Sequence, residues 1–175
     1  FDVSVGDRVG IYMPMVPEVV SILYGCFKAG AVAVPIFSGF GVDATATRLE
    51  EPECSVLFTA DGFSRRGSTI NLKESGDEAM AQVDCVDHAV VYNRLGGETP
   101  MTEGRDVPWA EAVGEADPHY ETTSLPSDQE SMLLYSSGTT GKPKGIVHTH
   151  AGVQVQCAKE IHFGFDQKPG DRFFW

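Results

Sequence analysis

Apolar and polar positions in the first half of the chain alternate between two patterns. Short apolar runs of strand length occur at residues 8–13, 31–37, 55–59 and 88–92. The segments between them carry apolar residues three to four positions apart, such as Val19, Ile22 and Cys26, which is the spacing of one helix face. Strand, helix and strand at this spacing make a βαβ unit with parallel strands and a right-handed crossover. We therefore expect the α/β class, a layered, mostly parallel sheet flanked by helices.

Proline and glycine mark the helix boundaries. Pro17 suits a helix N-terminus, where its missing amide hydrogen is harmless, and Gly30 suits the C-cap of the same helix. A second helix is predicted over 43–51, ahead of a proline. A third is predicted over 69–83, where Gly76 weakens the pattern.

The second half is less regular. Residues 93–131 are rich in glycine, proline and acids, which predicts an irregular excursion with one short helix around 109–113. Beyond it, the pattern predicts a buried strand at 132–135, a strand at 146–149, a helix at 151–161 and a turn at 168–172 leading into a last strand. We divide the chain into a βαβ-type first portion at 1–92, the excursion at 93–131, and a phosphate-loop segment with the start of the next α/β portion at 132–175.

The stretch from Ser136 to Gly145 holds only small, hydroxylated, glycine, proline and lysine residues. Such a composition cannot build a core, but it can align backbone amides and hydroxyls around an anion. The Walker A phosphate loop does not fit, because Ser136 stands where its first glycine belongs and Pro143 where its hydroxyl belongs. A different phosphate loop is indicated, with a surface turn between strands as the alternative.

These ten residues, Ser-Ser-Gly-Thr-Thr-Gly-Lys-Pro-Lys-Gly, resemble the signature loop of the adenylate-forming enzymes, the superfamily of acyl-CoA synthetases, luciferases and peptide-synthetase adenylation domains. Residues 6–18 are also similar to the acetyl-CoA synthetase branch. The resemblance implies partial subdomains of the large N-terminal domain of such an enzyme. Because the chain opens at Phe1 and closes on an apolar run, we expect an internal piece of a longer protein.

By this resemblance, the loop holds the β- and γ-phosphates of ATP, bound with Mg²⁺, while a carboxylate attacks the α-phosphorus. Positioning and charge neutralisation suffice for such chemistry. Lys144 is the catalytic cation expected at the γ-phosphate, whereas Lys142 is either a phosphate ligand or a solvated flanking residue. The implied phosphate-binding residues are Ser136, Ser137, Gly138, Thr139, Thr140, Gly141, Lys142 and Lys144.

Two further loops resemble the coenzyme A contacts of acetyl-CoA synthetases. Residues 36–40 match the stretch I-F-G-G-F apart from one serine in place of glycine. Residues 60–67 resemble an arginine-containing loop, although the second arginine of that loop has no clear match here. The resemblance implies that Phe37, Gly39 and Arg65 contact the adenine and 3′-phosphate end of coenzyme A, for which a forked, permanently charged arginine is suited. The alternative is a packed aromatic ring beside a solvated arginine.

The chain is acidic, with a net charge of −12 and a pI near 4.7. Nucleic acid and anionic membrane surfaces would be repelled, so neither is an expected partner. The balance fits either a protein of a high-salt environment, where self-repulsion is screened, or an ordinary acidic enzyme. A polyanionic substrate needs local positive charge, which the lysines of the loop supply.

The four cysteines are scattered without a metal-ligand or disulfide pattern, so they are expected to be small buried residues or free thiols. No run approaches the length of a membrane span, and the cytoplasm is the default location. His148 and His150 flank Thr149 on a predicted strand and would share one face. Because no third metal ligand is evident, we expect them to be hydrogen-bonded structural residues. Asp61 is expected to be a turn or cap residue.

The leading functional prediction is an AMP-forming acyl-CoA synthetase that acts on a small carboxylic acid, ATP and coenzyme A. The 175-residue piece alone should be inactive, because nothing in it clearly binds adenine or the acyl group. The alternative is a non-catalytic nucleotide-binding or regulatory domain that retains the phosphate loop. The acid itself and the oligomeric state are left open by the residues present.

Overall fold

The computed structural model describes residues 1–114, 116–136 and 143–174. Within these residues, seven strands form one sheet in the order β7-β6-β3-β1-β2-β8-β9, and β4 and β5 form a separate hairpin. The strands are β1 (Arg8–Tyr12), β2 (Val32–Pro35), β3 (Val56–Ala60), β4 (Gly62–Arg65), β5 (Ser68–Asn71), β6 (His88–Tyr92), β7 (Asp106–Pro108), β8 (Glu130–Ser136) and β9 (Lys144–Thr149). The helices are α1 (Pro17–Ala29), α2 (Val42–Glu50), α3 (Leu72–Met80), α4 (Trp109–Gly114), α5 (His150–Lys159) and the π-helical η1 (Glu160–Gly164).

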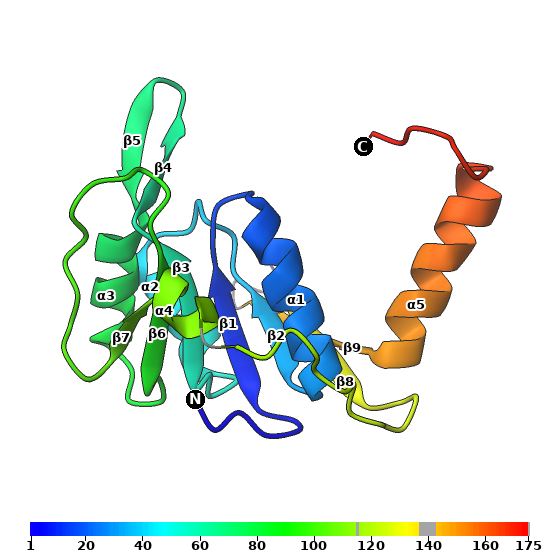
Figure 1. Ribbon diagram of the computed structural model, residues 1–175, viewed down its shortest axis with the longest axis horizontal. Coiled ribbons are helices and arrows are strands. Elements are labelled where there is room, and N and C mark those ends of the chain that lie inside the picture. Colours follow the sequence, from blue (N-terminus) through cyan, green and yellow to red (C-terminus); the bar gives the residue numbers. More distant parts are fainter. Residues whose placement is uncertain (115, 137–142, 175) are drawn as a thin grey trace.

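Parallel pairing dominates the sheet in the described residues. The central strand β1 pairs in parallel with β2 on one side and with β3 on the other. Beyond β3, β6 and β7 continue the parallel order. On the opposite side β8 adds in parallel to β2, whereas β9 returns antiparallel to β8. The predicted α/β class, a mostly parallel sheet flanked by helices, is confirmed (Figure 1).

Side chains of β1 alternate between two layers of helices. Val9 lines a cavity together with Ile22 of α1. Gly10 faces the opposite layer, where an added Cβ would lie 2.9 Å from a methyl carbon of Leu49 in α2. The absence of a side chain at Gly10 therefore lets α2 approach the sheet closely. Because both faces are covered, β1 is buried almost throughout, as the continuous apolar run predicts.

The loops that follow the parallel strands gather at one edge of the sheet, since parallel strands all end on the same side. These loops begin after Tyr12 of β1, Pro35 of β2, Ala60 of β3, Tyr92 of β6 and Ser136 of β8. The β4–β5 hairpin rises from this carboxyl edge (Figure 1). All the stretches singled out for phosphate or coenzyme A contact start there.

The helix predicted over 69–83 is wrong in its first turn. Its first residues belong to β5, which pairs antiparallel with β4, and α3 begins only at Leu72. Arg66 and Gly67 connect the two strands with positive φ angles of 52° and 81°. Positive φ at both central residues is the geometry of a type I′ turn, which suits the twist of a hairpin. The predicted arginine loop is thus the tip of a hairpin.

The strand predicted at 132–135 is confirmed, but it is longer and less buried than expected. In β8 only Ser131 is buried, and the other residues are half-buried or exposed. The strand lies next to the sheet edge formed by β9, whose first four residues are exposed. The short helix expected around 109–113 is confirmed as α4. The three-residue β7 before it was missed, because so short a run ending in proline carries no periodic signal.

Helix α5 begins at His150 and is exposed along most of its length, standing apart from the sheet in Figure 1. Residues 171–174 form no strand, so the predicted last strand is wrong for the part of it that is described. The two histidines do not share a strand either. His148 lies in β9, whereas His150 starts α5, where its ring meets Phe27 edge-on at 5.7 Å.

Candidate functional site

The phosphate loop leaves the sheet at Ser136 and re-enters it at Lys144. These two residues are register partners in the antiparallel pairing of β8 with β9. The Ser136 hydroxyl donates a long hydrogen bond, 3.5 Å, to the Lys144 carbonyl oxygen. Lys144 is exposed, so its ammonium group is free to meet a ligand at this edge. The other predicted phosphate-binding residues lie outside the described residues: Ser137, Gly138, Thr139, Thr140, Gly141 and Lys142.

The three residues predicted for coenzyme A contact lie together. Phe37 and Gly39 follow β2, and Arg65 ends β4, 26 positions further along the chain than Gly39. The guanidinium carbon of Arg65 lies 5.9 Å from the centre of the Phe37 ring. A Cβ on Gly39 would lie 2.5 Å from a Phe37 ring carbon and 3.1 Å from a guanidinium nitrogen of Arg65. Glycine at this position therefore permits the contact between ring and cation.

This cluster presents an open surface. The Phe37 side chain is 57% exposed although it is aromatic, and Arg65 is also exposed. On its inner side the Phe37 ring meets Phe40 edge-on, with 5.5 Å between ring centres. A supported ring with a free face beside a forked cation can stack on a planar base and pair with a phosphate.

A largely buried ion-pair network joins α3, the helix that follows the hairpin carrying Arg65, to the start of β7. Lys73, at the start of α3, contacts a carboxylate oxygen of Asp77 at 2.6 Å and one of Asp106 at 2.8 Å. Arg105 completes the network, at 2.5 Å from Asp77 and 2.7 Å from Asp106. The Asp106 carboxylate is fully buried. Burial acts to raise its pKa, but hydrogen bonds from Arg105 and Lys73 outweigh burial and leave the pKa below the ordinary value.

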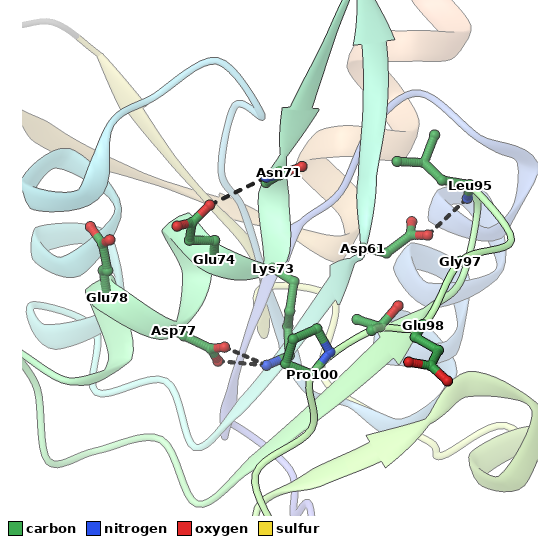
Figure 2. Close-up of a pocket in the computed structure, with 11 residues that line it drawn as sticks. Asp61, Asn71, Lys73, Glu74, Asp77, Glu78, Leu95, Gly97, Glu98 and Pro100 are labelled. Carbon is green, nitrogen blue, oxygen red and sulfur yellow. Dashed lines mark hydrogen bonds and ion pairs between the residues drawn. The ribbon is translucent and has the colours of Figure 1, made fainter.

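A cavity of about 570 Å³ opens beside this network (Figure 2). Carboxylates dominate the charged groups in its lining: Asp61, Glu74, Asp77, Glu78 and Glu98, against Lys73. Because Lys73 is already paired, the cavity is negative in character and unsuited to a phosphate. This hollow near the hairpin is thus not a good place for the anionic end of a nucleotide.

Asp61 is a turn residue, as the sequence suggests. Its carboxylate accepts hydrogen bonds from the backbone amides of Gly62 at 2.7 Å, Arg94 at 2.9 Å and Leu95 at 2.8 Å. Figure 2 shows the contact with Leu95 at the rim of the cavity. Asp61 therefore ties the loop after β3 to the loop after β6, a structural task that leaves little room for catalysis.

Sequence reasoning missed a buried arginine between the two candidate loops. Arg48 of α2 is only 5% exposed. Its guanidinium carbon lies 4.2 Å from the centre of the Phe40 ring and 5.3 Å from that of Tyr135. Tyr135 directly precedes Ser136 in β8. A charged residue within a helical apolar pattern reads as a solvated face from sequence alone, so only the contacts reveal its position.

Within the described ranges, no group of three or more histidine, cysteine, aspartate or glutamate side chains is placed to hold a metal ion. The same ranges contain no helix of the length and apolarity needed to cross a bilayer.

Known proteins similar to this chain are enzymes of one family. Residues 1–175 match the family model described as AMP-binding enzyme. The acetyl-coenzyme A synthetase of Mycobacterium tuberculosis (strain ATCC 25618 / H37Rv) is 42% identical over 172 residues, which cover 97% of this chain and 26% of that protein. The acetyl-coenzyme A synthetase of Pyrobaculum arsenaticum is 40% identical over 178 residues, covering 100% of this chain and 26% of that protein.

Solved structures agree with these relatives. The acetoacetyl-CoA synthetase from Streptomyces lividans superposes with a TM-score of 0.89 at 33% sequence identity, covering 99% of this chain and 26% of that one. The chain therefore spans about a quarter of the length of the relatives that it matches.

Proposed function

Because this chain belongs to the AMP-binding enzyme family, we propose that the protein carrying it is an acyl-CoA synthetase for a short carboxylic acid. In the first half-reaction, a carboxylate oxygen of the acid bonds to the α-phosphorus of ATP, and pyrophosphate leaves. In the second, the sulfur of coenzyme A bonds to the acyl carbon, AMP leaves, and the thiol proton passes to solvent. The relatives named acetyl- and acetoacetyl-CoA synthetases support a small acid.

The observation that carries this proposal is the meeting of Phe37, Gly39 and Arg65 at the edge from which the phosphate loop also departs. By the resemblance, each stretch serves a different half of the reaction. The fold places both at the carboxyl ends of β2 and β8, which are neighbouring strands. Ligands of open α/β sheets bind at this kind of edge.

For the first half-reaction, we assign the phosphates of ATP to the loop from Ser136 to Lys144. The triphosphate arrives as its magnesium complex, so the metal belongs to the substrate. Lys144 is assigned to the γ-phosphate, where its charge offsets that of the leaving pyrophosphate. In a chain with a net charge of −12, local cations are needed to admit such a ligand.

For the second half-reaction, we assign the adenine and 3′-phosphate end of coenzyme A to Phe37 and Arg65. The exposed face of the Phe37 ring suits a planar base. The Arg65 guanidinium suits a phosphate, which it can hold through two parallel hydrogen bonds. Gly39 is assigned the role of leaving space for both.

We also propose that the chain divides into three portions, with boundaries at 92/93 and 131/132.

The test uses the whole protein that contains this chain. We expect it to exchange labelled pyrophosphate into ATP only when a carboxylic acid is present, and to form an acyl thioester when coenzyme A is added. The competing proposal is a non-catalytic nucleotide-binding or regulatory domain. That reading predicts ATP binding by calorimetry without acid-dependent exchange, and observing this would remove the enzyme assignment.

A further inference from the structure

Arg48 is a buried cation with an unusual set of neighbours. One terminal nitrogen donates to the Ala44 carbonyl oxygen at 2.6 Å, within α2 itself. Its Nε is buried and has no hydrogen-bond partner among the described residues. The ion pairs of the described residues do not include it either. The guanidinium carbon lies 4.2 Å from the centre of the Phe40 ring and 5.3 Å from that of Tyr135, close enough for both rings to attract its charge.

Burying a charge without an opposite charge beside it is costly. An apolar side chain of similar size at position 48 would avoid that cost, so fold stability alone does not account for an arginine. What arginine supplies that an apolar residue does not is a flat cation that attracts two rings at once. The rings come from different segments: Phe40 follows β2, and Tyr135 lies near the end of β8.

The contacts continue outward from Arg48 in both directions. Phe40 meets Phe37 edge-on at 5.5 Å, and Phe37 lies 5.9 Å from Arg65. The backbone of Phe40 is also held, because its carbonyl oxygen accepts a hydrogen bond of 2.8 Å from the Tyr12 hydroxyl. On the other side Tyr135 is bonded directly to Ser136, where the phosphate loop begins.

We propose that Arg48 is a positioning residue that fixes the loop for coenzyme A and the base of the phosphate loop relative to one another. The inference rests on the proposed function and adds a residue that touches neither substrate. In this proposal one buried guanidinium aligns the loop for coenzyme A with the phosphate loop. The two loops must be aligned because they serve successive reactions of the same acyl group.

The Tyr135 phenol remains a neutral partner across the working pH range. Burial, together with the nearby Glu51 carboxylate, raises the pKa of Tyr135 to about 12. The ring that faces Arg48 therefore keeps its hydroxyl proton at neutral pH.

The experiment compares Arg48→Lys with Arg8→Lys in the whole protein. Arg8 is a matched control: it is partly buried, it donates to the backbone carbonyls of Pro52 and Gly6, and it lies at the amino end of β1, away from the candidate site. Lysine keeps the charge but loses the flat face. We expect Arg48→Lys to lower both acid-dependent pyrophosphate exchange and kcat/KM for coenzyme A by roughly 3- to 30-fold. Arg8→Lys should change neither.

A second variant, Phe40→Leu, covers the case in which Arg48→Lys folds poorly, because it should lower the same two rates while Arg48 is kept. Phe40→Leu removes one ring and leaves Arg48 in place. Where Arg48→Lys folds, the double variant Arg48→Lys/Phe40→Leu should lose little more kcat/KM for coenzyme A than Phe40→Leu alone, because both changes break the same contact. Losses that multiply independently would overturn the inference.

The outcomes also separate this inference from the proposed function. One outcome is that the wild-type protein catalyses acid-dependent exchange while Arg48→Lys and Arg8→Lys have equal exchange rates and equal kcat/KM for coenzyme A. That result would show that Arg48 is only structural, and the proposed function would stand. No acid-dependent exchange by the wild-type protein would overturn the proposed function and this inference together.

Discussion

Lys144 stands directly opposite Ser136 where β9 begins and β8 ends, and the Ser136 hydroxyl reaches the Lys144 carbonyl oxygen. The two ends of the phosphate loop are thus held at adjacent places in one sheet. An exposed lysine at this position can offer its charge to a ligand while its backbone stays paired. The backbone of Lys144, from which the proposed γ-phosphate contact is made, is therefore held in place by the pairing of β9 with β8.

Lys144→Ala should weaken acid-dependent pyrophosphate exchange by roughly one to two decades, because a lost charge-assisted contact costs ~1.5–3 kcal/mol. Lys159→Ala is the control, since Lys159 is an exposed lysine of α5 that pairs with Glu160 away from the loop. An exchange rate in Lys144→Ala equal to that of the control would remove Lys144 from the reaction.

Arg65→Lys should raise KM for coenzyme A by roughly tenfold, because lysine cannot make two parallel hydrogen bonds to a phosphate. Pyrophosphate exchange precedes coenzyme A binding and should be unchanged. The adjacent Arg66→Lys is the control, because it shares the turn. Equal KM values for the two variants would argue against a specific contact by Arg65.

Gly39→Ala should also raise KM for coenzyme A, with little loss of stability. The new methyl group would meet the Phe37 ring and Arg65, so the ring must turn away in the exposed direction. Gly97→Ala is a matched control, because nothing lies near an added Cβ at that exposed position. Steady-state kinetics and thermal melting measure the two effects; a normal KM in Gly39→Ala would contradict the proposed arrangement.

Asp106→Asn should destabilise the protein by about 3–5 kcal/mol at neutral pH, the usual cost of breaking a buried ion pair. The pKa of Asp106 is lowered in the folded state, so its stabilising effect is complete above the unfolded pKa of roughly 3.9. The effect is lost as pH falls through the lower folded pKa. Denaturant unfolding measures the free energy of unfolding at pH 7 and at pH 3. The difference between wild type and variant should be smaller at pH 3.

Glu103→Gln, at an exposed neighbouring position, is the control for Asp106→Asn and should melt like wild type at both pH values. A gap for Asp106→Asn that stays constant down to pH 3 would contradict the assigned pKa direction.

Thiol labelling should separate the cysteines by burial. Cys157 of α5 is exposed, whereas Cys26 and Cys54 are buried. Burial raises the pKa of Cys26 to about 12, so almost no reactive thiolate forms at pH 8. A maleimide should therefore modify Cys157 rapidly and the two buried thiols only in denaturant, as mapped by mass spectrometry. Rapid native labelling of Cys26 would show that the face of α1 against the sheet is open.

Apart from the β4–β5 hairpin, the order of strands and helices in the first 92 residues was readable because periodicity and capping act over a few neighbouring positions. Pro17 and Gly30 bound α1 as predicted, with Gly30 in the left-handed conformation at φ 81°. The β4–β5 hairpin was missed, although glycine at the second turn position was the available signal. The residues of β5 before Leu72 were predicted as the start of the following helix, although they form a strand.

The sequence alone also determined the chemistry of the candidate loops, because residue type decides what a side chain can bind. Tertiary structure decided which of them meet. Sheet order brings β8 beside β2, and hairpin geometry brings Arg65 to Phe37. Only the fold shows that Arg48 is buried between two rings, and that Lys73 and Asp106 neutralise each other. Such pairings depend on which strands become neighbours across long loops, and no local pattern records that choice.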